Sequence, residues 1–282
     1  MQEKNIVFND QPVYYRVTGA GQPVMLVHGF AEDGTVWENQ IDVLKEHYQL
    51  IIPDLPGSGK SIPDSYRDSH AQPPDWSMEY FASCLHAILQ HEQIHQVTMI
   101  GHSMGGYITL AFADEYPDQL QAFGLYHSTA YPDTEEKIAT RRRGIEFIQQ
   151  NGPKKFLEQS IPNLFAEPIK KQQPALVQQA LAHYSYFPAT SLIGYYEAMI
   201  RRPDRTAVLK SFPRPILFII GHYDTAVPAG QSLQQCHLPR VSFVKIFDHS
   251  GHMSMMEQAN EANQALLDFL SLGNLLTTNR LQ

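Results

Sequence analysis

Short apolar runs that alternate with amphipathic stretches organise most of this chain. The run at 23–27 is continuously apolar, which is typical of a strand buried on both faces of a sheet, and similar runs follow at 50–52, 97–100 and 122–126. Between these runs, apolar residues recur with helical spacing at 37–48, 77–90 and 105–116. Because strands and helices alternate, the pattern predicts a parallel sheet with right-handed crossover connections.

The two ends of the chain extend this pattern. Near the start, apolar segments at 6–8 and 13–17 flank the turn-prone pair Asn9-Asp10 and predict a hairpin. Near the end, strands are expected at 215–220 and 241–247. The sequence from Ser254 to Glu257 has the form of a capping box and predicts a final helix that reaches about Leu270.

The middle of the chain breaks the alternation. From about His127 to Pro213 the segments are mostly helical, are repeatedly interrupted by prolines and are rich in Phe and Tyr. We therefore predict an α/β fold with a mostly parallel central sheet flanked by helices, formed by residues 1–127 and 214–282. A helical insertion at 128–213 is expected after the sixth strand.

Composition narrows the possible functions. Apolar residues make up 43% of the 282 residues and charged residues 18%, which suits a packed core. The net charge of −8 argues against a nucleic-acid binder, which normally carries a basic face. The two cysteines, Cys84 and Cys236, are too few for a disulfide framework and fit a reducing compartment. Neither a signal peptide nor an apolar run of membrane-spanning length is visible, so a soluble, cytoplasmic protein is expected.

The strand at 97–100 leads into a turn that carries a candidate nucleophile. This turn reads Gly101-His-Ser103-Met-Gly105, a G-x-S-x-G pattern between a strand and a helix. The glycines leave room for close approach of the chain, and the turn lifts the Ser103 hydroxyl above the sheet. The following helix begins behind the hydroxyl, so the N–H of Met104 is placed to stabilise a developing oxyanion.

A serine nucleophile needs a base, and the base needs an orienting acid. Asp224 follows the strand at 215–220 and His252 follows the strand at 241–247, so both lie at the sheet edge that carries Ser103. Sequence order alone leaves His249 and His222 as rival bases and Asp248 as a rival acid. Asp248 is adjacent to His249 in the chain and is poorly placed to hold a neighbouring ring.

These segments together resemble the α/β-hydrolase superfamily, in its single-chain esterase and C–C-bond hydrolase branch. The segments that carry the resemblance are 28–30, 54–61, 101–106, 221–228 and 249–252. The resemblance implies that His252 is the base, that Asp224 is the acid and that the N–H of Phe30 is a second oxyanion donor. It also implies that the insertion at 128–213 is a helical cap, or lid, over the site.

The expected chemistry is acyl transfer through a covalent intermediate on Ser103, without a cofactor or a metal ion. The substrate would be a small ester or related acyl compound, apolar or amphipathic because of the aromatic cap. C–C bond cleavage, small-peptide hydrolysis and ligand sensing without turnover use the same scaffold and stay open. A serine at 103 argues against dehalogenases and epoxide hydrolases, which carry aspartate there. The oligomeric state is not visible in the sequence.

Three other motifs carry weaker signals. The H-E-x-x-H pattern from His91 to His95 resembles a zinc site, but it lies at a helix end and lacks an obvious third ligand, so a surface role is expected. The segment 59–61 matches only the end of a phosphate-binding loop. The basic run 141–143 predicts a solvated helix face, with an anchor for an anionic substrate or acidic carrier protein as the alternative.

Overall fold

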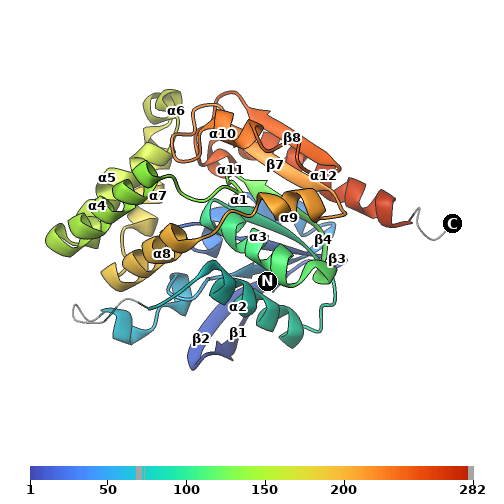
Figure 1. The fold of residues 1–282 in the computed structure, drawn as a ribbon, viewed down its shortest axis with the longest axis horizontal. Helices are drawn as coiled ribbons and strands as arrows, with labels where there is room; N and C mark the ends of the chain where they lie inside the picture. Colours follow the sequence, from blue (N-terminus) through green and yellow to red (C-terminus); the bar gives the residue numbers. More distant parts are fainter. Residues whose placement is uncertain (68–71, 73, 279–282) are drawn as a thin grey trace.

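A single twisted sheet forms the centre of the molecule (Figure 1). The structure is a computed structural model that describes residues 1–67, 72 and 74–278. Within these residues the sheet has eight strands in the order β1-β2-β4-β3-β5-β6-β7-β8. All neighbours from β4 to β8 pair in parallel, whereas β1 and β2 are antiparallel. The prediction of a mostly parallel α/β sheet is confirmed.

The strands occupy the apolar runs of the sequence. Those of the parallel part from β3 to β7 are buried along most of their length because helices cover both faces, whereas the edge strand β8 is largely exposed. Their bounds are β3 Gln22–Val27, β4 Tyr48–Pro53, β5 Val97–His102, β6 Leu120–Tyr126, β7 Ile216–Gly221 and β8 Ser242–Phe247.

The predicted hairpin forms the edge of the sheet. Strand β1 (Gln2–Phe8) pairs with β2 (Gln11–Thr18) across a two-residue turn. Asn9 and Asp10 in this turn both have positive φ, of 48° and 60°. Asn and Asp tolerate this conformation, and its twist matches that of the flanking strands.

Two groups of helices flank the sheet. Helix α3 contacts α2 and α9, and helix α12 contacts α1 and α11. Their bounds are α1 Glu38–Leu44, α2 Met78–His91, α3 Met104–Glu115, α9 Thr206–Ser211, α11 Ser254–Glu257 and α12 Ala259–Thr278. The short helix α10 (Ala229–Leu233) lies between β7 and β8. None of the helices in the described part of the chain is long and apolar enough to cross a membrane.

Five helices between β6 and β7 lie to one side of the sheet, at the left of Figure 1. They are α4 Glu135–Asn151, α5 Pro153–Ser160, α6 Glu167–Gln172, α7 Pro174–Tyr184 and α8 Ala189–Arg201. Helix α9 follows them but contacts α3 of the sheet layer. The division into a core at 1–127 and 214–282 and a cap at 128–213 stays a prediction.

Two local expectations are wrong. The helical spacing at 37–48 covers a 3₁₀ turn, the short helix α1 and the start of β4 rather than one helix. The capping box at Ser254 does not form, because the Ser254 hydroxyl bonds to the hydroxyl of Tyr126 and to His127 instead. The final helix begins only at Ala259, after Gln258, whose φ of −135° and ψ of 57° lie outside the helical region.

Candidate active site

Ser103 occupies a strained turn between β5 and α3. Its φ of 52° and ψ of −116° are unusual for a residue with a side chain, and its N–H donates to the carbonyl of Tyr126 at 2.9 Å. The flanking glycines make this turn possible. A Cβ atom on Gly101 would lie 2.3 Å from the carbonyl oxygen of Gly105, and one on Gly105 would lie 2.5 Å from that of Val27.

Asp224 and His252 meet at the carboxyl edge of the sheet. Nδ1 of His252 lies 2.8 Å from Oδ2 of Asp224, and both side chains are buried. The other carboxylate oxygen accepts from the N–H groups of Ala226 and Val227 at 2.8 and 2.9 Å. Burial alone would raise the pKa of Asp224, but the adjacent histidines outweigh it and hold that pKa below its usual range.

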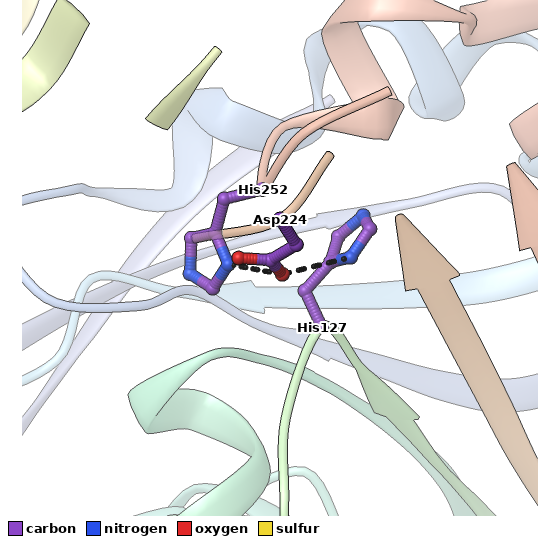
Figure 2. A group of neighbouring side chains, drawn as sticks. All are labelled: His127, Asp224 and His252. Atoms are coloured by element: carbon purple, nitrogen blue, oxygen red, sulfur yellow. Dashed lines mark hydrogen bonds and ion pairs between the residues drawn. The ribbon is translucent and has the colours of Figure 1, made fainter. Parts of the chain in front are cut away.

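A second histidine, His127, approaches the same carboxylate from the end of β6 (Figure 2). Its Nδ1 lies 3.4 Å from Oδ2 of Asp224, and its Nε2 lies 2.7 Å from the hydroxyl of Ser254. Burial lowers the pKa of His127 to about 4, so the ring is neutral at pH 7. Within the described residues, His127, Asp224 and His252 are the one group of three side chains that are close enough to share a metal ion.

A buried ion pair links the loop after β3 to the serine turn. Glu32 accepts from the N–H of Gly29 at 2.7 Å and lies 2.9 Å from Nδ1 of His102. Nε2 of His102 lies 2.9 Å from the carbonyl oxygen of His252. Because both partners of His102 accept hydrogen bonds, both ring nitrogens donate and the ring is protonated. Burial alone would lower the pKa of His102, but the Glu32 carboxylate outweighs burial, and the net effect is a raised pKa.

Glu257 holds the loop that carries His252. Its carboxylate accepts three backbone N–H groups at 2.7–3.1 Å, from Ala166, Gly251 and Met253. The N–H of His252 itself donates to the carbonyl of Leu164 at 2.7 Å. The loop is therefore fixed both to α11 and to the segment between α5 and α6. Burial raises the pKa of Glu257 to about 6.

A cavity of about 170 Å³ connects Ser103 and His252 with the helices above the sheet. Most of its wall is apolar or aromatic, with side chains from α3, α4, α7 and α8. It is lined by Phe30, Ser103, Tyr107, Ile161, Leu164, Phe165, Ala180, Tyr184, Tyr196, Met199, Val227 and His252, among others. The ring of Phe30 stacks on that of Tyr196 at 4.4 Å.

Of the two predicted oxyanion donors, Phe30 lies at this cavity and Met104 directly follows Ser103 in the chain. Phe30 and Ser103 both line the cavity, and Met104 is the first residue of α3. The N–H of a first helical residue has no partner within the helix. It is therefore available to an oxygen that approaches Ser103.

The predicted base and acid differ in burial from the alternative residues that the sequence left open. His222, Asp248 and His249 are exposed, whereas Asp224 and His252 are buried against each other. His91 and His95 are also exposed, and Glu92 between them pairs with Lys4. In the run 141–143 only Arg141 is buried, and it lines the cavity, so the expectation of a fully solvated basic face is wrong at that residue.

The patterns in the sequence do not single out His127, Glu32, His102 or Glu257 as site residues. His127 directly follows β6, so the rule that identified Asp224, a polar residue at the carboxyl end of a buried strand, would also have selected it. Glu32 and His102 carry no such signal, because their pairing depends on two loops that are 70 residues apart in the chain.

Comparison with known proteins places this geometry among hydrolases. A family model described as "alpha/beta hydrolase fold" matches residues 22–259. A pimeloyl-[acyl-carrier protein] methyl ester esterase of Vibrio cholerae is 27% identical, covering 91% of this chain and 97% of its own. A 2-hydroxy-6-oxo-2,4-heptadienoate hydrolase of Pseudomonas putida is 26% identical, covering 90% of each chain. A thermophilic esterase from Thermogutta terrifontis, solved with malate bound, has a TM-score of 0.88 and 29% identity, covering 97% of this chain and 99% of its own.

Proposed function

The chain belongs to the alpha/beta hydrolase fold family, and from this premise we propose that it hydrolyses small carboxylic esters with Ser103 as the nucleophile. The resemblance found in the sequence is confirmed by the family match, and so is the prediction of an enzyme of the hydrolase class. One observation carries the assignment of residues. The buried contact between His252 and Asp224 lies beside a strained serine on the same cavity.

The proposed reaction has two steps. Ser103 Oγ attacks the ester carbonyl while His252 takes its proton, and the N–H groups of Phe30 and Met104 hold the oxyanion. The alcohol then leaves with the proton from His252, and the acyl group stays on Ser103. Water, deprotonated by His252, attacks the acyl-enzyme, and His252 returns that proton to Ser103 Oγ as the bond to serine breaks and the acid is released. Asp224 holds the ring so that Nδ1 carries a proton and stabilises the imidazolium that forms in each step.

The cavity supports a small substrate with an apolar or amphipathic body. Its wall is mainly aromatic and aliphatic, which favours an apolar acyl group in contact with it. The esterases among the similar proteins favour ester cleavage as the reaction to test first. We also propose a reducing, cytoplasmic setting, because Cys84 and Cys236 are free thiols.

The decisive experiment replaces Ser103 by Ala and measures turnover of 4-nitrophenyl butanoate. We expect turnover to fall by at least about 10³-fold, since the covalent step is lost. Ser271→Ala, an exposed serine on α12, is the matched control and keeps wild-type turnover. A fluorophosphonate probe should label the wild type and the control but not Ser103→Ala. Wild-type turnover by Ser103→Ala would contradict the proposal.

A further inference from the structure

Two cationic side chains from α4 reach the cavity that holds Ser103. Lys137 and Arg141 are four residues apart, so they lie on one face of this helix, and both line the cavity wall. We propose that they bind a carboxylate on the substrate, so that this enzyme prefers esters that carry a second, anionic group. This inference rests on the proposed function and adds the substrate class to it.

Positive charge exceeds negative charge on this side of the cavity. Asp133 is the carboxylate that Arg141 contacts, at 2.6 Å from its Nε, but Asp133 also pairs with Arg202 at 2.9 Å. All three residues are largely buried. Asp133 thus faces two guanidinium groups, and Lys137 adds a third cation one turn away. The Asp224 carboxylate also acts on Lys137, so three cations face two carboxylates here. Unbalanced charge in a buried place is costly, and a bound anion offsets that cost.

Arg141 retains hydrogen-bonding capacity beyond this ion pair. Asp133 occupies the edge of the guanidinium formed by Nε and Nη2. A guanidinium has five N–H donors, so Nη1 and its two N–H groups lie outside the pair. Such an edge suits a carboxylate, which accepts two parallel hydrogen bonds from arginine. The ring of Tyr196 lies 5.5 Å from the guanidinium carbon and helps to fix its position.

Lys137 brings its charge close to the reacting groups. Its Nζ donates to the carbonyl of Ala226 at 3.0 Å, two residues beyond Asp224. Burial, together with the charge of Arg141, lowers the pKa of Lys137. An anion bound between the two side chains would raise the pKa of Lys137 again. Its charge would stabilise the protonated amine and offset the repulsion by Arg141.

The rest of the cavity wall supports selection of an anion. Glu32 also lines the cavity, but its charge is matched by protonated His102. The remaining lining side chains are mostly apolar or aromatic, so a carboxylate there has few competing partners and little water. In such surroundings a hydrogen bond between charged groups contributes more to the free energy of binding than it does at the protein surface.

The test compares matched esters of which one member carries a carboxylate and the other does not. One pair is mono-(4-nitrophenyl) glutarate and 4-nitrophenyl pentanoate, with the carboxylate on the acyl side. A second pair is 4-acetoxybenzoate and phenyl acetate, with the carboxylate on the alcohol side. We expect wild type to prefer the anionic member of at least one pair by about 10-fold or more in kcat/KM. Lys137→Met and Arg141→Gln should each reduce that preference by about 10-fold.

The controls separate this inference from the proposed function. Arg142→Gln removes a neighbouring cation from the exposed face of the same helix and keeps the wild-type preference. Lys137→Met tests the inference even if Arg141→Gln fails to fold. Equal kcat/KM within both pairs, or a preference that survives in Lys137→Met and in folded Arg141→Gln, would overturn the inference while Ser103-dependent hydrolysis stands. Turnover that persists in Ser103→Ala would instead overturn the proposed function.

Discussion

At the scale of single residues, the site depends on which partner each histidine faces. His102 faces an anion and a carbonyl and is therefore protonated, whereas His127 is buried and neutral. His252 faces Asp224 through Nδ1 and leaves its other nitrogen for the substrate side. The three rings lie within 6.1 Å of one another, yet different partners leave His102 protonated and His127 neutral.

His127 is expected to position Asp224 rather than to react. Its Nδ1 lies 3.4 Å from the oxygen that also binds His252, too far for a hydrogen bond in this structure but close enough for a small shift of the ring to form one. Loss of the ring therefore lets the carboxylate rotate and misalign the base. His127→Leu should lower kcat by about 10-fold, the value of one hydrogen bond to a charged group, with little change in KM. The measurement is steady-state kinetics with 4-nitrophenyl butanoate from pH 5 to 9.

His127→Asn is the matched rescue variant. Its amide N–H can replace Nδ1–H, and Asn tolerates the positive φ of 49° at this position. We therefore expect it to restore most of the lost kcat. If both variants lower kcat equally, or if neither does, His127 does not act through a hydrogen bond to Asp224.

At the scale of elements, the sequence predicted what depends on local pattern and failed where distant segments decide. The apolar runs identified the strands, and the edge rule brought Ser103, Asp224 and His252 together. The capping box at Ser254 failed because Tyr126 and His127, more than 120 residues away, compete for the hydroxyl. The inward direction of Arg141 likewise depends on Asp133 and on the packing of α4 against α8, which local charge pattern does not encode.

The free energy of unfolding should depend on pH through Glu257, whose carboxylate holds the loop between β8 and α11. The pKa of Glu257 is about 6 in the folded state and about 4.5 when unfolded, so the folded state binds more protons between these pH values. Stability from this group is full below pH 4.5 and is lost as the pH rises through 6. The free energy of unfolding of wild type, relative to Glu257→Gln, should fall by about 2 kcal/mol in total, of which about 1.6 kcal/mol falls between pH 4.5 and pH 7.

Urea unfolding of both proteins at pH 4.5, 5.3, 6 and 7 measures this difference. Glu261→Gln changes an exposed carboxylate on α12 and should follow the wild-type pH profile. Parallel profiles for wild type and Glu257→Gln would show that the three N–H donors keep the Glu257 carboxylate ionised throughout.

At the scale of the whole molecule, hydrogen bonds and ring contacts around the cavity join the helices above the sheet to the loops at its edge. Tyr195 on α8 donates to the carbonyl of Pro56 at 2.8 Å, and Phe30 stacks on Tyr196. On the other side, the Tyr186 hydroxyl donates to Asp33 at 2.7 Å. Because these contacts join the loops after β3 and β4 to the segment that begins at α7, they determine how closely the cavity is covered.

Asp33 joins α7 to the loop after β3, so its loss should make local opening of α7 more frequent. His183 on α7 lies 3.4 Å from Asp33 and 2.8 Å from the hydroxyl of Thr35. The Asp33 carboxylate, as the hydrogen-bond acceptor, raises the pKa of His183. The groups that donate to Asp33 outweigh burial and lower the pKa of Asp33. Asp33→Asn keeps the shape but removes the charge. We expect amide hydrogen exchange in α7 to accelerate by about 5- to 30-fold, which corresponds to a loss of about 1–2 kcal/mol.

Exchange in α12, far from this contact, should not change, and Asp42→Asn at an exposed surface pair should leave α7 at its wild-type rate. The ion pair with His183 requires a protonated ring, so its contribution is present below the unfolded pKa of about 6.5 and is lost as the pH rises through the raised folded value. The acceleration caused by Asp33→Asn should therefore be larger at pH 6 than at pH 9. An equal acceleration at both pH values would show that the contacts of Asp33 with Tyr186 and Thr35, and not the ion pair with His183, stabilise α7.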